Sequence, residues 1–399
     1  MLRGNLREQI VTLARKLATE MVDPKSLEAF VACRLIPLDK CPGVRPIGIG
    51  EILRRIIGKV IGWALKEDIQ IAAGPLQAAT GLQGGAEAAI HAMKQVFEDE
   101  DTEAVILVDA SNAFNSLNRQ VALHNIQYTC PPFAKVLINT YRQPSHLFVA
   151  GGKEISSREG TTQGDNLAGS FYALGTTPLQ NKLREKSPEI KQVWLADDAT
   201  GGGSIINLRP WWDTIINDGG KFGYDVNEGK SWLILKDPAK LQLARDTFQG
   251  TAIKITTEGK RHLGAALGSE DFKTQYVSDK VAKWCEEIHQ LAEIAKSQPQ
   301  AAYAAFTLGE KHRFSYFMRT ISGMRNLMQP LDDVINKELI PAILGTDTFS
   351  PVDRELFSLP LRFGGHGMPV LSGIAEEEYL MSKRLTAPLA TIMVMQGCL

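Results

Sequence analysis

The sequence predicts an α+β fold, in which strands and helices are mixed up to about residue 268 and helices follow. Two short apolar runs, 104–108 and 193–196, are typical of strands that are buried on both faces. The region from about 270 to 345 has no strand-like alternation, which favours helices. A chain of 399 residues, 44% of them hydrophobic, can bury a sizeable core in roughly two or three packed subdomains.

The elements before residue 100 are predicted from apolar spacing and turn residues. Ile10, Leu13 and Leu17 recur at three- and four-residue steps, which is typical of a helix. A turn at Pro42-Gly43 between two strand-like stretches favours a hairpin. The predicted elements are a helical segment at 5–33, strands at 34–40 and 44–49, and helices at about 51–68, where Arg54, Arg55 and Lys59 add positive charge, and 84–98.

The later elements surround the two apolar strands. Gly151-Gly152 predicts the turn of a hairpin. Asp165 or Asn166 is expected to cap the predicted helix at 167–184. The predicted elements are a strand at 104–108, helices at 117–126 and 131–142, a hairpin at 147–159, a helix at 167–184, a strand at 193–196, and a strand pair made by 252–256 and 261–267.

Both apolar strands end on carboxylates, Asp109 after the first and Asp197-Asp198 after the second. If the strands are adjacent, these side chains lie together and need a compensating charge, and Mg²⁺ prefers oxygen ligands. Two such ions roughly 3.5–4 Å apart can stabilise the attacking and leaving oxygens of an in-line phosphoryl transfer. The pattern favours such a site, although either segment alone could be a solvated turn.

Six motifs in order resemble those of reverse transcriptases, and most closely the polymerase region of non-LTR retrotransposons. The similar segments are 34–49 (paired finger motifs), 105–119 (motif A), 163–169 (motif B), 196–198 (motif C), 223–231 (motif D) and 261–268 (primer-grip motif E). The resemblance implies a right-hand polymerase, with fingers and palm built from an antiparallel sheet with helices and followed by a helical thumb. The implied parts are an N-terminal helical extension (1–33), fingers and palm (34–268), a thumb (269–345) and a C-terminal segment of unknown role (346–399).

The resemblance also implies catalytic residues for an RNA-directed DNA polymerase that adds deoxynucleotides to a primer 3′-hydroxyl. Asp109, Asp197 and Asp198 would hold two Mg²⁺ ions, with Mn²⁺ as a possible substitute. Lys230 would be a general acid toward the leaving pyrophosphate, and an ordinary surface lysine is the alternative. The implied partners are an RNA template, a DNA primer and deoxynucleoside triphosphates.

Further residues would bind the substrates. Arg45 and Lys40 would contact the triphosphate, because a guanidinium can grip phosphate with two donors, or else be solvated hairpin charges. Phe114 would exclude a ribose 2′-hydroxyl, or else be a core phenylalanine. The list is completed by Gln163 and Gly164 against the nascent base pair and by the Leu263-Gly264 turn against the primer end.

Other functions stay open at this point. An RNA-dependent RNA polymerase also uses motif A and motif C acids, and Phe114 disfavours it. A catalytically silent, element-derived nucleic-acid-binding protein is the second alternative, and a metal-dependent nuclease is the third. Asn166 and Ala199 depart from the family pattern, which commonly has proline and often glycine there, so reduced activity or a decayed copy is also open.

The bulk properties place few limits on function. The formal net charge of −1 requires any basic surface to be local. The five cysteines are too scattered for a disulfide framework or a zinc site, and we expect a reducing intracellular compartment, nuclear or cytoplasmic. No uncharged apolar stretch of about 18 residues occurs, so neither a membrane span nor a secretory signal is expected.

Overall fold

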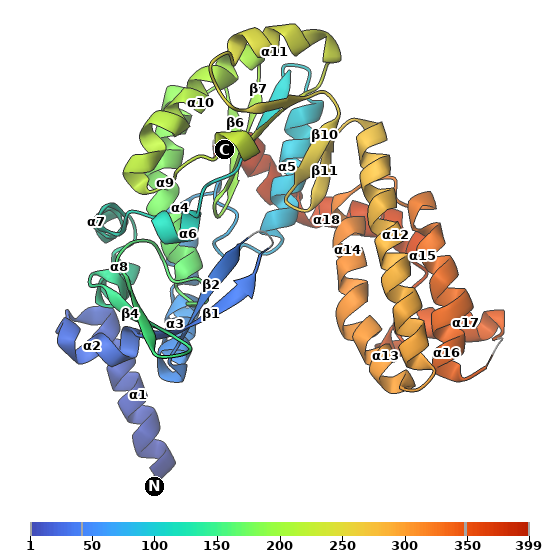
Figure 1. Ribbon diagram of the computed structural model, residues 1–399, viewed down its shortest axis with the longest axis horizontal. Helices are drawn as coiled ribbons and strands as arrows, with labels where there is room; N and C mark the ends of the chain where they lie inside the picture. Colours follow the sequence, from blue (N-terminus) through green and yellow to red (C-terminus); the bar gives the residue numbers. More distant parts are fainter. Residues whose placement is uncertain (1, 41–42, 347–348, 398–399) are drawn as a thin grey trace. The chain divides into compact units, whose positions relative to one another are not determined.

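The computed structural model describes residues 2–40, 43–346 and 349–397 (Figure 1). These residues form two compact units, each described here by itself. The first unit is Met1–Leu233, Ala239–Ile255 and Leu389–Leu399, and the second is Ile234–Pro238 and Thr256–Pro388. The subdomain boundaries that the resemblance implies stay predictions.

Strands β1 to β9 form two sheets, with the orders β2-β1-β4-β5 and β6-β7-β3-β8-β9. The strands predicted before residue 210 are present, and Pro42 of the first predicted turn lies outside the described residues. The strands are β1 (Cys33–Asp39), β2 (Val44–Gly50), β3 (Ala104–Val108), β4 (Ser145–Val149), β5 (Lys153–Ser157), β6 (Lys191–Leu195), β7 (Asp198–Gly203), β8 (Trp232–Leu235) and β9 (Lys254–Thr256).

The helices of the first unit surround these sheets. The predicted helix at 51–68 is two helices, because Leu65 leaves the helical conformation at φ −103° and ψ 17°. The helices are α1 (Leu2–Thr19), α2 (Pro24–Val31), α3 (Ile52–Ala64), α4 (Lys66–Ala73), α5 (Gly85–Glu98), α6 (Ala113–Ser116), α7 (Arg119–Thr129), α8 (Pro131–Tyr141), α9 (Ala168–Lys186), α10 (Ile205–Gly219) and α11 (Leu241–Thr247).

The larger sheet is buried because helices cover both of its faces. Successive residues of a strand point to opposite faces. A Cβ on Gly201 would lie 3.3 Å from Trp211 of α10, whereas a Cβ on Gly202 would lie 2.6 Å from Val96 of α5. The glycines of β7 therefore let the two helices approach the sheet closely from either side.

The second unit begins with a hairpin and continues as helices. Its aromatic core includes Trp284, whose ring centroid lies 4.9 Å from those of Phe314 and Phe317. The elements are β10 (Gly259–His262), β11 (Ala265–Gly268), α12 (Glu270–Ala295), α13 (Pro299–Ala305), α14 (Lys311–Thr320), α15 (Gln329–Val334), α16 (Ile340–Leu344), α17 (Pro351–Ser358) and the first part of α18 (Leu371–Val394).

The predicted pairing of 252–256 with 261–267 is wrong. The segment 261–267 contains two strands, β10 and β11, which pair with each other in an antiparallel hairpin. Leu263 and Gly264 both have positive φ, at 48° and 92°, which is the backbone conformation of a tight two-residue hairpin turn. The segment 252–256 instead contributes β9 to the larger sheet.

Two further expectations concern the described residues only. Cys33, Cys130 and Cys285 are free, and Cys41 and Cys398 lie outside the described ranges. Among the helices that the structure describes, none combines the length and the apolar character that crossing a membrane requires.

Candidate active site

The acids predicted as metal ligands lie at neighbouring strand ends in the first unit. β3 pairs with β7 so that Val108 is opposite Ala199, and β6 pairs with β7 so that Leu195 is opposite Asp198. Asp109 follows β3, and Asp197 lies in the β6–β7 turn. The two predicted strands, β3 and β6, are therefore not adjacent as expected, because β7 lies between them. The acids nevertheless lie near one another, since Asp109 follows β3 at the same edge as the β6–β7 turn that carries Asp197.

The carboxyl of Asp197 has a raised pKa. Its burial raises its pKa, and the neighbouring Asp109 raises that pKa further, while Arg45 and Lys40 lower it. Asp198 is exposed at the first position of β7. A cation bound beside Asp197 would lower this pKa, because it would stabilise the ionised carboxylate.

The turn that carries Asp197 is held by buried side chains. Gln77 is fully buried, and its side-chain amide accepts from the N–H of Ala196 at 2.8 Å and donates to the Ala196 carbonyl at 3.3 Å. This pair of bonds supports Ala196 at a φ of 55°, which a non-glycine residue rarely adopts. The hydroxyl of Tyr224 donates to the Asp197 carbonyl at 2.8 Å.

The backbone of Asp109 is tied to the segment that contains Lys230. The Asp109 N–H donates to the Ser231 hydroxyl at 3.1 Å, and its carbonyl accepts from the Asn227 N–H at 2.7 Å. Lys230 is exposed and ends a 3₁₀ turn, Glu228–Lys230. The predicted general acid, Lys230, is therefore adjacent in sequence to Ser231, which accepts the hydrogen bond from the Asp109 backbone.

One cavity of about 460 Å³ collects most of the predicted substrate-binding residues. Asp109, Asp198 and Lys230 are not among the described residues that line it. The predicted residues that line it are Lys40, Arg45, Phe114, Gln163, Gly164 and Asp197. Lys40 and Arg45 are both exposed on the β1–β2 hairpin, so the cavity has a cationic side, and two acidic residues, Asp165 and Asp197, also line it.

Phe114 is held in place by contacts of its ring and of its backbone carbonyl. Its ring stacks on that of Tyr172, with centroids 4.6 Å apart and an interplanar angle of 17°. Its carbonyl accepts from the N–H of Thr161 at 2.5 Å. Tyr172 is fully buried on α9, and its hydroxyl has no hydrogen-bond partner among the described residues.

Gln163 and Gly164 lie on a segment, here called the 160–168 loop, that runs against strand β2. The Gly48 N–H donates to the Gln163 carbonyl at 2.7 Å. Gly164 has a φ of 105°, and a Cβ there would lie 2.7 Å from the Gly48 carbonyl oxygen. Only glycine allows this approach without strain.

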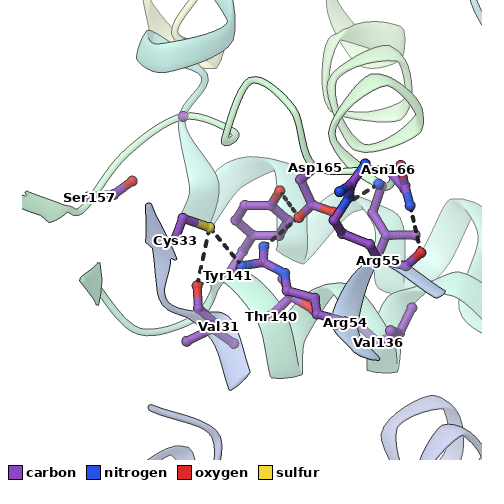
Figure 2. Close-up of polar contacts among 12 residues, drawn as sticks. Val31, Cys33, Arg54, Arg55, Val136, Thr140, Tyr141, Ser157, Asp165 and Asn166 are labelled. Atoms are coloured by element: carbon purple, nitrogen blue, oxygen red, sulfur yellow. Dashed lines mark hydrogen bonds and ion pairs between the residues drawn. The ribbon is translucent and has the colours of Figure 1, made fainter. Parts of the chain in front are cut away.

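Arg54, one of three residues that add positive charge to the predicted helix at 51–68, is buried. Its side chain is only 6% exposed and pairs with Asp165 of the 160–168 loop (Figure 2). Asp165 does not cap α9 directly, because α9 begins at Ala168 with Leu167 at its N-cap. The Asp165 carboxylate instead accepts the N–H of Leu167, at 3.1 Å. No local sequence signal separates Arg54 from its exposed neighbour Arg55.

The predicted primer-grip residues lie in the second unit, at the β10–β11 turn. The Tyr316 hydroxyl donates to the Leu263 carbonyl at 2.6 Å, and the Tyr276 hydroxyl donates to the Gly264 carbonyl at 2.9 Å. His262 is buried beside this turn, and burial lowers its pKa to about 4. The turn is therefore held firmly to the helices of its own unit.

A metal site made by protein side chains alone is not preformed. In the ranges that the structure describes, no group of three or more His, Cys, Asp or Glu side chains is arranged to hold a metal ion. The donor chemistry nevertheless suits Mg²⁺, because Asp109 and Asp197 supply hard oxygens close enough to affect each other. Mg²⁺ at phosphoryl-transfer sites is usually held by one or two carboxylates together with substrate phosphates and water.

Comparison with known proteins gives matches among solved structures only. No protein-family model and no curated protein matches the sequence. The chain is similar to apo telomerase from Candida tropicalis, at 12% identity and a TM-score of 0.49, over 99% of this chain and 70% of that one. It is similar to telomerase from Candida albicans in complex with a TWJ fragment of telomeric RNA, at 11% identity and 0.46, over 98% and 66%.

A third similar structure is a truncated apo telomerase from Candida tropicalis, at 14% identity and a TM-score of 0.37, over 56% of this chain and 52% of that one. The chain thus spans less than two thirds of the length of two of these three telomerase chains. All three TM-scores are below 0.5, so the functional conclusion must come from the chain's own residues.

Proposed function

We propose that this chain is an RNA-directed DNA polymerase that originates from a retrotransposable element of the non-LTR type. The observation that carries the proposal is the cavity in the first unit. There, two cationic residues of the β1–β2 hairpin, Phe114 and the 160–168 loop surround Asp197, which follows the second of the two acid-bearing strands. Its volume of about 460 Å³ falls in the range of small-molecule sites.

The cavity residues suit an incoming deoxynucleoside triphosphate. Arg45 and Lys40 supply the positive charge that a triphosphate needs, and the Arg45 guanidinium can donate to two phosphate oxygens at once. Phe114 is held by Tyr172, so its ring can act as a rigid wall against a ribose 2′-hydroxyl. Gln163 and Gly164 supply the surface for the nascent base pair, and the template RNA determines which base pairs there.

The acids would prepare the primer end for reaction. Asp109 and Asp197, with Asp198 beside them, would hold two Mg²⁺ ions together with the substrate phosphates. Bound Mg²⁺ supplies charge stabilisation for the attacking and leaving oxygens. The primer 3′-hydroxyl would lose its proton to water and attack the α-phosphate. A phosphodiester bond would form, the bond between the α- and β-phosphates would break, and pyrophosphate would leave with a proton that Lys230 would give.

A second candidate function is a catalytically silent protein that binds a primer–template hybrid. The specific observation that favours it is that the cationic Lys40 and Arg45 line the cavity, whereas Asp109 and Asp198 are not among the described residues that line it. The two candidates differ in one respect that can be measured, since only the polymerase extends the primer that it binds.

Primer extension tests the proposal directly. Wild type is assayed on poly(rA) with an oligo(dT) primer and dTTP, in Mg²⁺ or Mn²⁺, beside Asp197→Ala and the control Asp213→Ala. Asp213 is an acid of α10 that pairs with Arg209 on the surface at 2.9 Å. We expect extension by wild type and by the control, and a loss of roughly a thousandfold in Asp197→Ala, because a lost metal ligand removes several kcal/mol of stabilisation.

The opposite result is equally clear. If folded wild type binds the hybrid and does not extend it with either ion, the polymerase proposal is wrong and the silent binder is supported. Equal activity of wild type and Asp197→Ala would show that the acids do not form the site.

A further inference from the structure

A buried polar network (Figure 2) is centred on Asp165, a residue of the 160–168 loop that is also among the residues lining the cavity. Asp165 Oδ2 accepts from Arg54 Nη2 at 2.5 Å and from the Tyr141 hydroxyl at 2.6 Å. Asp165 Oδ1 accepts from the Leu167 N–H at 3.1 Å. The side chains of Arg54 and Asp165 are 6% and 5% exposed. Both carboxylate oxygens thus accept hydrogen bonds from protein donors.

Arg54 also contacts the segment that joins helix α2 to strand β1. Its Nη1 donates to the Val31 carbonyl at 2.6 Å and lies 3.2 Å from Cys33 Sγ. Val31 ends α2 and Cys33 begins β1, so one guanidinium joins the base of the β1–β2 hairpin to the 160–168 loop. The same hairpin carries both cationic residues that line the cavity.

The loop depends on such contacts because it has no regular secondary structure of its own. Besides the Arg54–Asp165 pair, the Asn166 side-chain amide donates to the Arg55 carbonyl at 2.6 Å. The Gly48 N–H donates to the Gln163 carbonyl, and the Thr161 N–H donates to the Phe114 carbonyl. Among these ties, only the Arg54–Asp165 pair is ionic and buried, and removing one partner of such a pair leaves an uncompensated buried charge.

We propose that Arg54, Asp165 and Tyr141 are positioning residues that set how Gln163 and Gly164 face the nucleotide. This inference rests on the proposed function for its kinetic part. Although Asp165 is among the residues that line the cavity, both of its carboxylate oxygens accept hydrogen bonds from protein donors, so the network acts through the position of the loop. It fixes the loop relative to the β1–β2 hairpin, and thereby fixes the distance between the base-pair surface and the triphosphate-binding cations.

The kinetic test compares Asp165→Asn with wild type in the primer-extension assay. The asparagine keeps the shape of the side chain and removes the charge that pairs with Arg54. We expect the KM for dTTP to rise about 10- to 100-fold, with a smaller change in kcat, because a displaced binding surface weakens alignment before it changes the chemistry. The matched control is Asp213→Asn, which breaks an exposed Arg–Asp pair and should leave KM unchanged.

A structural test probes the same network without measuring enzymatic activity. Hydrogen–deuterium exchange of peptides that cover 160–168 is compared in wild type, Asp165→Asn and Tyr141→Phe. The N–H groups of Thr161, Asp165 and Ala168 are hydrogen-bonded and should exchange slowly in wild type. We expect at least about tenfold faster exchange there in Asp165→Asn, and a smaller increase in Tyr141→Phe, which loses one donor.

The outcomes separate this inference from the proposed function. Unchanged loop exchange in a folded Asp165→Asn protein overturns the positioning role, as does a loss of kcat with KM unchanged. If Asp165→Asn does not fold, Tyr141→Phe decides the point by the same readouts, because its ring still packs on Phe171 at 4.9 Å. If wild type does not extend primers, the proposed function fails and the exchange result alone decides whether the network positions the loop.

Discussion

Replacing Gly164 with alanine is expected to move the 160–168 loop away from strand β2. Two separate penalties act at this residue. Its φ of 105° is a conformation that residues with a Cβ rarely adopt, and the added Cβ would lie 2.7 Å from the carbonyl oxygen of Gly48. The oxygen belongs to a backbone whose N–H is itself bound to the loop, so it cannot move away without breaking that hydrogen bond.

The two penalties can be estimated separately. An L-residue in a positive-φ conformation costs roughly 1–2 kcal/mol. Inserting a methyl group into a space that is already full costs about 1–3 kcal/mol more, because the neighbouring backbone must shift. Together they predict that Gly164→Ala lowers the free energy of unfolding of the first unit by about 2–5 kcal/mol, and that the KM for a nucleotide rises.

The assay is urea unfolding of the protein with each of three glycine-to-alanine substitutions, all of which lie in the first unit. Gly250 has a φ of 81° with no atom within 4 Å of its Cβ position, so Gly250→Ala isolates the conformational penalty. Gly62 lies in α3 with no atom within 4 Å and no positive φ, so Gly62→Ala should stabilise the helix by up to about 1 kcal/mol. The expected order of stability is Gly62→Ala, wild type, Gly250→Ala and Gly164→Ala.

The comparison with Gly250→Ala is the decisive one. If Gly164→Ala costs no more than Gly250→Ala, then the close approach of the loop to β2 does not exist in solution. The argument that the loop is fixed against the β1–β2 hairpin would then lose its geometric basis.

Three further predictions concern other parts of the chain. Phe114→Val should raise the use of rUTP relative to dTTP by about tenfold or more in single-nucleotide extension, and an unchanged ratio would speak against its role as a wall. His262 has a folded pKa of about 4, below its unfolded value, so stability should fall as the pH drops from about 6.5 to 4, by about 3 kcal/mol in urea titrations. His262→Gln should flatten that dependence, and equal slopes would contradict it. Gln396→Ala removes two hydrogen bonds to the Gln192 backbone, at 3.1 and 3.0 Å, and should cost about 1–3 kcal/mol in thermal unfolding, whereas an unchanged Tm would contradict this.

The parts of the fold that the sequence predicted well are those that depend on local patterns. The run 104–108 is apolar at every position, and a strand with both faces covered needs no polar residue. The run ends on Asp109, the first residue that a buried strand would not tolerate. Gly151-Gly152 likewise marks a hairpin whose two strands, β4 and β5, are present.

The parts that it missed depend on contacts far apart in the chain. Arg54 and Arg55 are adjacent and chemically alike, and only the tertiary fold buries the first against Asp165. Gln77 reaches the turn at Ala196 from a distant segment, so no spacing rule identifies it. Leu263 occupies a positive-φ turn position without being glycine or asparagine, so Gly264 was the only glycine at the β10–β11 turn that signalled a break between two strands.

The two departures from the reverse-transcriptase pattern, Asn166 and Ala199, each fit their surroundings in the structure. Asn166 stands where the reverse-transcriptase pattern commonly has proline, and its side-chain amide donates to the Arg55 carbonyl at 2.6 Å, a bond that proline cannot make. Ala199 stands where that pattern often has glycine, and it is buried in β7 opposite Val108. Its φ is not among the positive values of the described residues, so this strand position does not require glycine. Both departures are accommodated by ordinary contacts, and neither displaces Asp197 or Asp109 from the strand ends on which the proposed activity depends.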